Sequence, residues 1–138
     1  MQSVQEVTAT MRAKGLRATP QRQCIIRLLQ DNHSHPTVES LYEEALGEMP
    51  TISQRTVYQT VHDLESLGEV RLLDLGTGSL RVEPNLENPH HHLACIVCGR
   101  VVDIPVEFPG LRVPDDYLGG FSVDTVEVVF RGRCETCT

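Results

Sequence analysis

Apolar residues recur at helical spacing in the first half of the chain, between residues that typically begin or end a helix. Val4, Val7 and Met11 predict a helix over residues 4–14, which Gly15 can end in the left-handed conformation. Threonines that can act as N-caps precede two more predicted helices, over about residues 20–31 and 38–47. The first half of the chain is therefore expected to be mainly helical.

The clearest helix in the sequence lies between Ser53, which can cap it, and Gly68, which can end it. Its apolar stripe consists of Val57, Val61, Leu64 and Leu67. The opposite face carries Arg55, Tyr58, Gln59 and His62. A cation, a phenol and an amide on one face, with no acid among them, are groups that read base edges and hold phosphates. This face predicts contact with nucleic acid.

Two segments of alternating polarity follow, residues 69–74 and 80–83, on either side of a glycine-rich stretch. This pattern predicts a β-hairpin. Helices followed by a small hairpin are the outline of a winged helix-turn-helix, an α+β fold that binds DNA. The alternative is a generic small α+β domain with a solvated helix face, because helix-turn-helix patterns give many false positives.

The charge distribution supports the DNA-binding hypothesis, although the net charge by itself does not. The whole chain carries −7, which gives no general attraction to nucleic acid. Residues 1–30 hold five basic residues and one acidic residue, a net charge of +4 that leaves −11 for the remainder. A basic front and an acidic rear are typical of a DNA-facing part joined to a cation-binding part.

The length of 138 residues suits one domain or two small ones. We expect a DNA-binding domain over residues 1–84 and a metal-binding domain over residues 85–138. Domains of this size bury little apolar surface, so metal or dimerisation would help to stabilise them. No apolar run is long enough to cross a membrane and no signal peptide is evident, which predicts a soluble, cytoplasmic protein.

Four of the five cysteines form two Cys-x-x-Cys pairs, Cys95 with Cys98 and Cys134 with Cys137. Two such pairs supply four thiolates at tetrahedral angles, the closed geometry of structural zinc. The pairs are far apart in the sequence, so we expect strands within residues 96–103 and 122–131 to pair antiparallel and bring them together. Two redox-active dithiols are the alternative interpretation.

Three adjacent histidines precede the first cysteine pair. On a strand, His90 and His92 would share one face while His91 would point away. Glu83 and Asp103 are close in the sequence, and a mixed histidine–carboxylate site is open to Fe(II), Mn(II) or Zn(II). A solvated surface tract is the alternative interpretation.

These features occur in motifs that together resemble one family. The motifs are Gly15-Leu16-Arg17-Ala18-Thr19-Pro20-Gln21-Arg22, His35-Pro36-Thr37, Thr56-Val57-Tyr58-Gln59, Arg81-Val82-Glu83, His90-x-His92-x-x-Cys95-x-x-Cys98-Gly99 and the final Cys-x-x-Cys. Through them the chain resembles the ferric uptake regulator family over nearly its whole length. The resemblance implies a homodimer with an N-terminal winged helix-turn-helix and a small C-terminal α/β dimerisation domain that has an antiparallel sheet.

The resemblance also implies two metal sites and a mechanism. It implies a structural Zn²⁺ held by Cys95, Cys98, Cys134 and Cys137. It implies a regulatory Fe²⁺ or Mn²⁺ between the domains, held by His35, Glu83, His90, His92 and Asp103. Metal at the regulatory site would favour a closed dimer whose two DNA-reading helices match successive major grooves of a double-stranded operator.

Candidate DNA contacts are Arg17, Arg22, Arg55, Thr56, Tyr58 and Gln59. By resemblance, Arg17 would enter the minor groove and Tyr58 would touch bases. Gln59 stands where the family usually has arginine, so the base preference of the family is not carried over. Residues 106–120 contain prolines and paired glycines, so we expect a short turn in place of the long dimerisation helix of many members.

The expected activity is repression of transcription, because nothing in the sequence marks the substrate pocket or general base of a metal hydrolase or oxygenase. Arg81-Val82-Glu83 and residues 126–134 are most similar to the branch that represses catalase-type and oxidative-stress genes. This favours a peroxide-responsive repressor in which Fe(II) leads to oxidation of His35 or His92. Glu83, where peroxide-sensing members usually have aspartate, favours iron sensing as the alternative. A structural zinc protein that binds protein partners is an alternative of another class.

Overall fold

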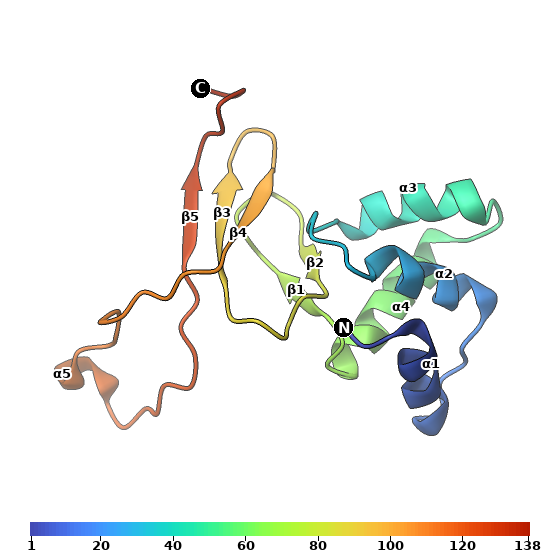
Figure 1. The fold of residues 1–138 in the computed structure, drawn as a ribbon, viewed down its shortest axis with the longest axis horizontal. Coiled ribbons are helices and arrows are strands. Elements are labelled where there is room, and N and C mark those ends of the chain that lie inside the picture. Colours follow the sequence, from blue (N-terminus) through green and yellow to red (C-terminus); the bar gives the residue numbers. More distant parts are fainter.

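The computed structural model describes residues 1–138 and has a helical lobe and a sheet lobe with a β-hairpin between them (Figure 1). The helical lobe contains α1 (Val4–Ala13), α2 (Pro20–Leu29), α3 (Val38–Glu48) and α4 (Gln54–Ser66). The hairpin consists of β1 (Arg71–Leu73) and β2 (Arg81–Glu83). The sheet lobe contains β3 (His91–Cys95), β4 (Val101–Ile104), α5 (Asp115–Leu118) and β5 (Val129–Gly132). None of the helices has the length and apolar character that a membrane crossing requires.

Three of the four helices in the helical lobe begin at the caps predicted from the sequence, and Ser3, for which no cap was predicted, caps α1. The side-chain oxygen of the capping residue accepts the backbone N–H three residues later at Ser3, Thr19, Thr37 and Ser53. Each bond satisfies an N–H group that a helix start leaves without a partner. Gly15 and Gly68 follow α1 and α4 with φ of 77° and 75°, the left-handed conformation expected of them. The second helix ends earlier than predicted, at Leu29, because Gln30 has extended backbone.

The hairpin is anchored to the helical lobe by its buried face. Fifteen buried residues form the core of that lobe, and they include Val57, Val61 and Leu64 from the predicted stripe of α4. Val70 and Val82 of the hairpin segment complete this core. The winged helix predicted from the pattern of polarity is thus present, with the hairpin packed against the helices.

The same hairpin also packs on the sheet lobe. A second, much smaller core consists of Leu73, Leu75 and Ala94, with Val101 and Val129 packed against it. Two of its three buried residues belong to the hairpin segment, so the sheet lobe has almost no core of its own. The hairpin therefore joins the two lobes physically as well as in the sequence.

The sheet lobe contains a three-stranded sheet in the order β4-β3-β5. The central strand β3 pairs antiparallel with β4 and parallel with β5. The prediction that residues 96–103 and 122–131 pair antiparallel with each other is therefore wrong. Residues 96–98 form a turn between β3 and β4, and the long connection over residues 105–128 lets the chain re-enter the sheet in the parallel direction.

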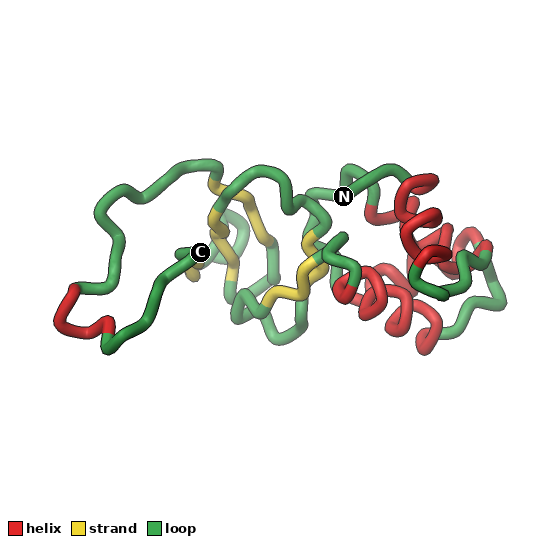
Figure 2. The backbone as a smooth tube through the Cα atoms, turned by 90° about the horizontal axis from the view of Figure 1, so that it is seen from below, coloured by secondary structure: helices red, strands yellow, loops and turns green.

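Residues 105–128 form an arm that projects from the sheet lobe on the side away from the helices, as Figures 1 and 2 show. The helix α5 within it has four residues, which confirms the predicted short turn. Tyr117 and Phe121 of the arm are 80% and 79% exposed. These aromatic side chains have little packing within one copy of the chain.

Candidate metal centre and nucleic-acid interface

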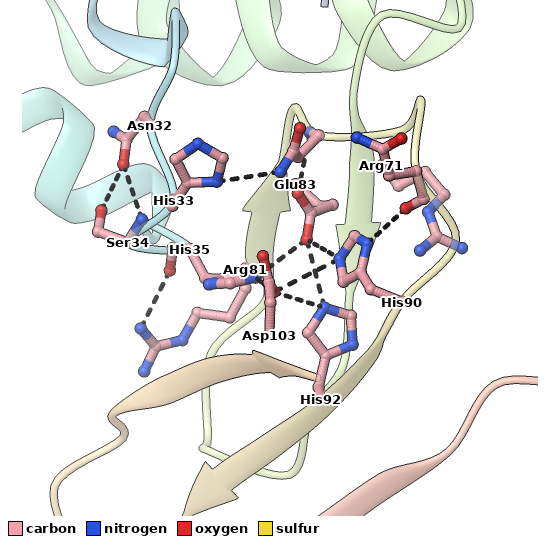
Figure 3. A network of polar contacts seen from close by, with 12 residues as sticks. Asn32, His33, Ser34, His35, Arg71, Arg81, Glu83, His90, His92 and Asp103 are labelled. Carbon is pink, nitrogen blue, oxygen red and sulfur yellow. Dashed lines mark hydrogen bonds and ion pairs between the residues drawn. The ribbon is translucent and has the colours of Figure 1, made fainter. Parts of the chain in front are cut away.

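Glu83 lies at the centre of a buried cluster of histidines and carboxylates (Figure 3). Its Oε2 atom is 2.9 Å from Nε2 of His35, 3.0 Å from Nε2 of His90 and 3.3 Å from Nε2 of His92. Asp103 Oδ1 lies 2.8, 3.4 and 3.6 Å from the same nitrogens in that order. The structure thus brings together all five residues that the sequence proposed for the regulatory site.

The helical lobe and the hairpin supply two members of this cluster. His35 lies in the loop between α2 and α3 and has a backbone φ of 52°. Glu83 is the last residue of β2, and both side chains are 1% exposed. The adjacent Val82 N–H donates to the carbonyl of Pro36 at 2.8 Å. Strand β2 therefore holds the histidine loop by its backbone beside the carboxylate.

The sheet lobe supplies the other three members. His92 and Asp103 are direct partners in the ladder between β3 and β4. His90 precedes β3, and the centroid of its ring is 4.8 Å from that of His92. His91 points to the other side of the strand, where its Nδ1 accepts the N–H of Val128 at 3.0 Å. The alternation of side chains along a strand predicted this division of the three histidines.

Several polar atoms of the cluster are buried without a hydrogen-bond partner: both ring nitrogens of His35, Nδ1 of His92 and Oδ1 of Asp103. His35 Nε2 and Asp103 Oδ1 are 2.8 Å apart, yet their geometry is not that of a hydrogen bond. Donor atoms that share an ion at bonds of about 2.0–2.2 Å lie roughly 3 Å from one another. Buried lone pairs at such spacing fit a shared cation, and this mixture of imidazole and carboxylate suits iron, manganese or zinc.

Without a metal, the cluster is a network of mutually stabilising charges. Burial alone would raise the pKa of Glu83, but the adjacent ring of His35 and hydrogen bonds from His92, the Asn85 N–H and His90 lower it well below its ordinary value of 4.5. Burial alone would lower the pKa of His35, but the adjacent carboxylates of Glu83 and Asp103 raise it above 6.5. A divalent cation would compete with protons for the same nitrogen and oxygen atoms.

Groups outside the cluster orient its members. The carbonyl of Asn88 accepts a hydrogen bond from His90 Nδ1–H at 2.8 Å, so Nε2 is the ring nitrogen that faces Glu83 and is placed to bind a metal. Glu83 Oε1 accepts the backbone N–H of Asn85 at 2.9 Å. The side-chain amide of Asn85 lies 2.9 Å from Nδ1 of His33. The segment between the lobes is therefore tied to the loop that carries His35.

The four cysteines of the two pairs form a second cluster at one end of the sheet. Their sulfur atoms all lie within 4.8 Å of one another, and those of Cys98 and Cys134 are 3.7 Å apart. The register of Cys95 with Gly132 in the β3–β5 ladder brings the second pair to the end of β3. The parallel pairing of β5 with β3 thus brings the two cysteine pairs together, which was expected of an antiparallel pairing.

The cysteine cluster also fits a cation. Backbone N–H groups of Cys98, Cys134 and Val97 lower the pKa of the Cys95 thiol to about 6. Bonding to Cys134 raises the pKa of Cys137 to about 12, because a further negative charge is unfavourable among the neighbouring sulfurs. Four thiolates can therefore coexist here with a cation among them, and four sulfur ligands suit structural zinc.

The candidate DNA contacts gather where the connector between α1 and α2 meets the start of α4. Arg17, Arg22, Arg55, Thr56 and Gln59 all line one hollow of about 390 Å³, whose lining includes no acidic residue. Tyr58 lies outside this hollow, is 44% exposed and stacks on the ring of His62 at 5.7 Å. Five of the six proposed contacts therefore share one basic surface, and the sixth is on α4 beside it.

Arg22 differs from the other arginines of the hollow because it forms an ion pair. Its Nη1 lies 2.9 Å from Oδ2 of Asp63 on α4, and the two side chains are 17% and 16% exposed. Gln59 Nε2 donates to the other oxygen of the same carboxylate at 3.1 Å. Arg22 therefore links α2 to α4, which leaves Arg17 and Arg55 as the cations of the hollow that are better placed for phosphates.

Three residues had no role assigned from the sequence: Asp63, Arg81 and Asn85. The pairing of Asp63 depends on how two helices cross, for which the sequence contains no local signal. Arg81 and Glu83 are two residues apart on β2, so the two-residue period of a strand places both side chains on the same face. For Arg81 a usable signal was therefore present.

The structure brings potential metal ligands from both lobes together, while the helical lobe presents a basic hollow beside an exposed helix face. This construction is that of a metal-responsive DNA-binding regulator. The sequence profile of the ferric uptake regulator family matches residues 13–110, and the chain belongs to this family. It is accordingly a metal-responsive transcriptional regulator and not an enzyme.

Similar proteins agree with this assignment. The peroxide-responsive repressor PerR of Staphylococcus aureus (strain Mu50 / ATCC 700699) is 33% identical over 137 residues, which cover 97% of this chain and 90% of that protein. The Helicobacter pylori ferric uptake regulator Fur, whose structure is described as revealing three functional metal binding sites, has a TM-score of 0.79 at 16% identity and covers 99% of this chain and 94% of its own. A zinc-bound manganese uptake regulator has a TM-score of 0.72 at 28% identity, covering 96% and 99%. The predicted fold, a winged helix followed by a dimerisation-type domain, is confirmed.

Proposed function

We propose that this chain is a metal-dependent repressor that binds a double-stranded DNA operator as a homodimer and responds to peroxide. The observation that carries the proposal is the Glu83 cluster, in which His35 from the helical lobe meets His90 and His92 from the sheet lobe around one carboxylate. We assign residues 1–84 to the DNA-binding domain and residues 85–138 to the metal-binding dimerisation domain. We also propose a cytoplasmic location, where operator DNA is accessible.

The loop of His35 connects the cluster to the DNA-binding helices. His35 is followed by Thr37, which caps α3, and α3 packs against α4. When His35 is held beside Glu83 and His92, α4 keeps a fixed orientation relative to the sheet lobe. A regulatory Fe²⁺ or Mn²⁺ would supply the charge that holds the five ligands together, and its loss would let the lobes separate. We assign a structural Zn²⁺ to the cysteine cluster.

DNA contact is proposed for α4 and the connector before α2. Arg55, Tyr58 and Gln59 lie on the exposed face of α4 and would enter the major groove. Arg17 would reach the adjacent minor groove, and the hydroxyl of Thr56 would hold a phosphate. In a homodimer the two copies of α4 would occupy successive major grooves about 34 Å apart.

The exposed face of the sheet supports the homodimer. Leu93 of β3 is in register with Val102 of β4 and with Phe130 of β5, and these side chains are 45%, 40% and 44% exposed. These three side chains form an apolar surface that a single copy leaves partly exposed. We expect Leu93→Lys to give a monomer in sedimentation experiments, whereas Leu80→Lys, at a 50% exposed position near the hairpin tip, keeps the dimer. An unchanged dimer in Leu93→Lys would refute this surface.

The similarity to PerR supports peroxide as the signal. Bound Fe(II) would supply the activation of peroxide next to the imidazoles. His35 and His92 are 1% and 0% exposed and both face Glu83, so their rings would lie beside the bound metal and away from solvent. In the overall reaction one ring C–H becomes C–O and the ring loses two electrons. The O–O bond of peroxide breaks, and its second oxygen leaves as water. An oxidised ring is a poorer ligand, so the lobes would separate and the DNA would be released.

The decisive experiment compares Fe(II)-loaded and Mn(II)-loaded protein on promoter DNA before and after peroxide. We expect release in the Fe(II) form alone, with the mass of one oxygen gained on a peptide that carries His35 or His92. DNA binding that does not depend on metal would refute the metal-dependent repressor. Release accompanied by zinc loss and disulfide formation would locate the peroxide response at the cysteine cluster instead.

Iron sensing is the second candidate function, and the identity of Glu83 favours it. Peroxide-sensing members of the family usually have aspartate at this position, as the sequence resemblance implies. Fe(II)-dependent DNA binding that survives peroxide without a gain of oxygen would support iron sensing. A structural zinc protein that binds protein partners is the candidate of another class. If that candidate is correct, Arg55→Ala combined with Tyr58→Ala leaves the activity of the protein intact. If the protein is a DNA-binding repressor, the same pair of changes should abolish DNA binding.

A further inference from the structure

The side chain of Arg81 contacts both the loop that carries His35 and the turn of the first cysteine pair. Its Nη1 donates to the carbonyl of His35 at 3.1 Å, and its Nη2 donates to the carbonyl of Gly99 at 2.8 Å. Its Nε donates to Oγ1 of Thr77 at 3.2 Å, within the hairpin loop. Figure 3 shows the bond from Arg81 to the His35 carbonyl, close to Asp103 and the cluster. One guanidinium thus connects the hairpin, the helical lobe and the sheet lobe.

The backbone of His35 needs such a contact. Its φ of 52° is a conformation that residues other than glycine seldom adopt, and it persists where the surroundings hold it. Three consecutive residues of β2 provide the hold. Arg81 binds the His35 carbonyl, the Val82 N–H binds the Pro36 carbonyl, and Glu83 faces the His35 ring. Arg81 therefore acts on the peptide that sets the direction of a metal-ligand side chain.

Gly99 makes room for this contact. A Cβ atom at Gly99 would lie 2.5 Å from Nη2 of Arg81, so any side chain there would displace the guanidinium. Gly76 in the hairpin loop makes room for another arginine in the same way, because a Cβ atom at Gly76 would collide with the side chain of Arg131 on β5. Arg131 Nε donates to the carbonyl of Leu75 at 3.0 Å and docks the hairpin on the sheet without a bond to the His35 loop. Arg131 and Gly76 are therefore matched controls for Arg81 and Gly99.

We propose that Arg81 is a positioning residue of the metal centre, which fixes the His35 backbone so that its ring faces Glu83 and is itself anchored on the carbonyl of Gly99. A lysine would reach one of the two carbonyls as a point donor, whereas the planar fork of arginine reaches both. This inference rests on the proposed metal-dependent function. It adds to the five proposed metal ligands a residue that binds no metal itself but holds the backbone of one ligand, His35, in place.

The test is the Mn(II) affinity of zinc-loaded protein, measured by calorimetry in the absence of DNA. Arg81→Met should weaken binding about 10–100-fold, as loss of an orienting partner of a metal ligand does, with Arg81→Lys in between. Arg131→Met should leave the affinity unchanged. In metal-free protein, the imidazole NMR signals of His35 should shift in Arg81→Met and not in Arg131→Met. Equal affinities in the wild type and Arg81→Met, or equal losses in both methionine variants, would overturn the proposal.

A pair of glycine variants tests the same point while both guanidiniums remain. Gly99 and Gly76 have φ of 77° and 76°, so alanine introduces similar backbone strain at each. Gly99→Ala alone should weaken Mn(II) binding, and this comparison decides the matter if Arg81→Met does not fold. If the wild type binds no Mn(II), the proposed function and this inference both fall, whereas DNA binding that is equal with and without Mn(II) would refute the proposed function alone. A working wild-type switch with full affinity in Arg81→Met and Gly99→Ala would overturn this inference alone.

Discussion

Glu83 contacts three imidazoles, so its charge and theirs are linked in the metal-free protein. Its pKa is lowered from 4.5, and the stability it contributes is present above that value and lost as pH falls through the folded-state pKa. The pKa values of His35 and His90 are raised from 6.5. Their contribution is fully present below that value and lost as pH rises through the folded-state pKa values. The metal-free cluster should therefore stabilise the protein most between pH 4.5 and 6.5.

We accordingly predict how Glu83→Gln changes the pH dependence of stability in the metal-free, zinc-retaining protein. The difference in free energy of unfolding between the wild type and the variant should be largest near pH 5.5. It should become smaller above about pH 7. Urea unfolding of both proteins across this range measures it, and the variant cancels contributions from the rest of the chain. A difference that does not vary with pH would contradict the linkage. Mn(II) should remove the loss at high pH, since it replaces the protons.

The Arg22–Asp63 ion pair gives a second prediction about single residues. The pair is mostly buried, with side chains 17% and 16% exposed, whereas the Arg27–Glu48 pair is 52% and 50% exposed. Arg22→Met should lower the free energy of unfolding by about 1–3 kcal/mol, between the values for exposed and fully buried pairs. Arg27→Met, the matched control, should cost less than about 1 kcal/mol. Denaturant unfolding of the two variants provides the comparison, and equal losses would show that burial of the Arg22 pair has no effect.

Helix α4 allows a prediction about DNA binding that separates phosphate contact from base contact. Arg55 is exposed and borders the acid-free hollow, so it is suited to a phosphate. Arg55→Ala should weaken binding to all sequences alike and reduce the slope of log affinity against log salt by about 1. Gln59→Ala should instead change the preference between operator and scrambled DNA and leave the slope intact. Fluorescence anisotropy at several salt concentrations distinguishes these outcomes, and an unchanged slope in Arg55→Ala would exclude its phosphate contact.

The boundaries of the helices could be predicted because they depend on neighbouring residues. Ser53 and Thr19 each satisfy an N–H group three residues away, and Gly68 adopts a positive φ without a Cβ penalty. The partner of β5 could not be predicted in the same way. Alternation identifies a strand, but the strand it pairs with and the direction of pairing depend on the path of residues 105–128.

Some members of the metal cluster could likewise be predicted from neighbouring residues, and others could not. The shared face of His90 and His92 follows from the period of a strand. His35 is far from them in the sequence and lies in a loop, so its place in the cluster came from the family resemblance and not from spacing. The ion pair of Arg22 and the fork of Arg81 both bridge separate elements. Contacts of this kind depend on how the elements pack together, which no local pattern encodes.

The two lobes differ in what stabilises them. The helical lobe has a core of fifteen buried residues, while the core beneath the sheet has three, of which Leu73 and Leu75 come from the hairpin segment. So small a core cannot offset the conformational entropy lost by the sheet lobe and its arm. Structural zinc binding contributes about 10–16 kcal/mol in small metal-dependent domains, enough to make folding depend on the ion. We therefore expect zinc at the cysteine cluster to determine whether the sheet lobe is folded.

We thus predict that removing zinc unfolds the sheet lobe and leaves the helical lobe folded. The amides of His92 and Ile96, which donate to carbonyls of Val128 and Gly132, should lose protection from hydrogen exchange, while amides within α4 keep theirs. Cys134→Ser should reproduce this result. Glu135→Gln, a change beside the cluster that removes no ligand, should not. Simultaneous loss of protection in both lobes would mean that they fold as one cooperative unit, and protected sheet amides in zinc-free protein would mean that burial alone suffices.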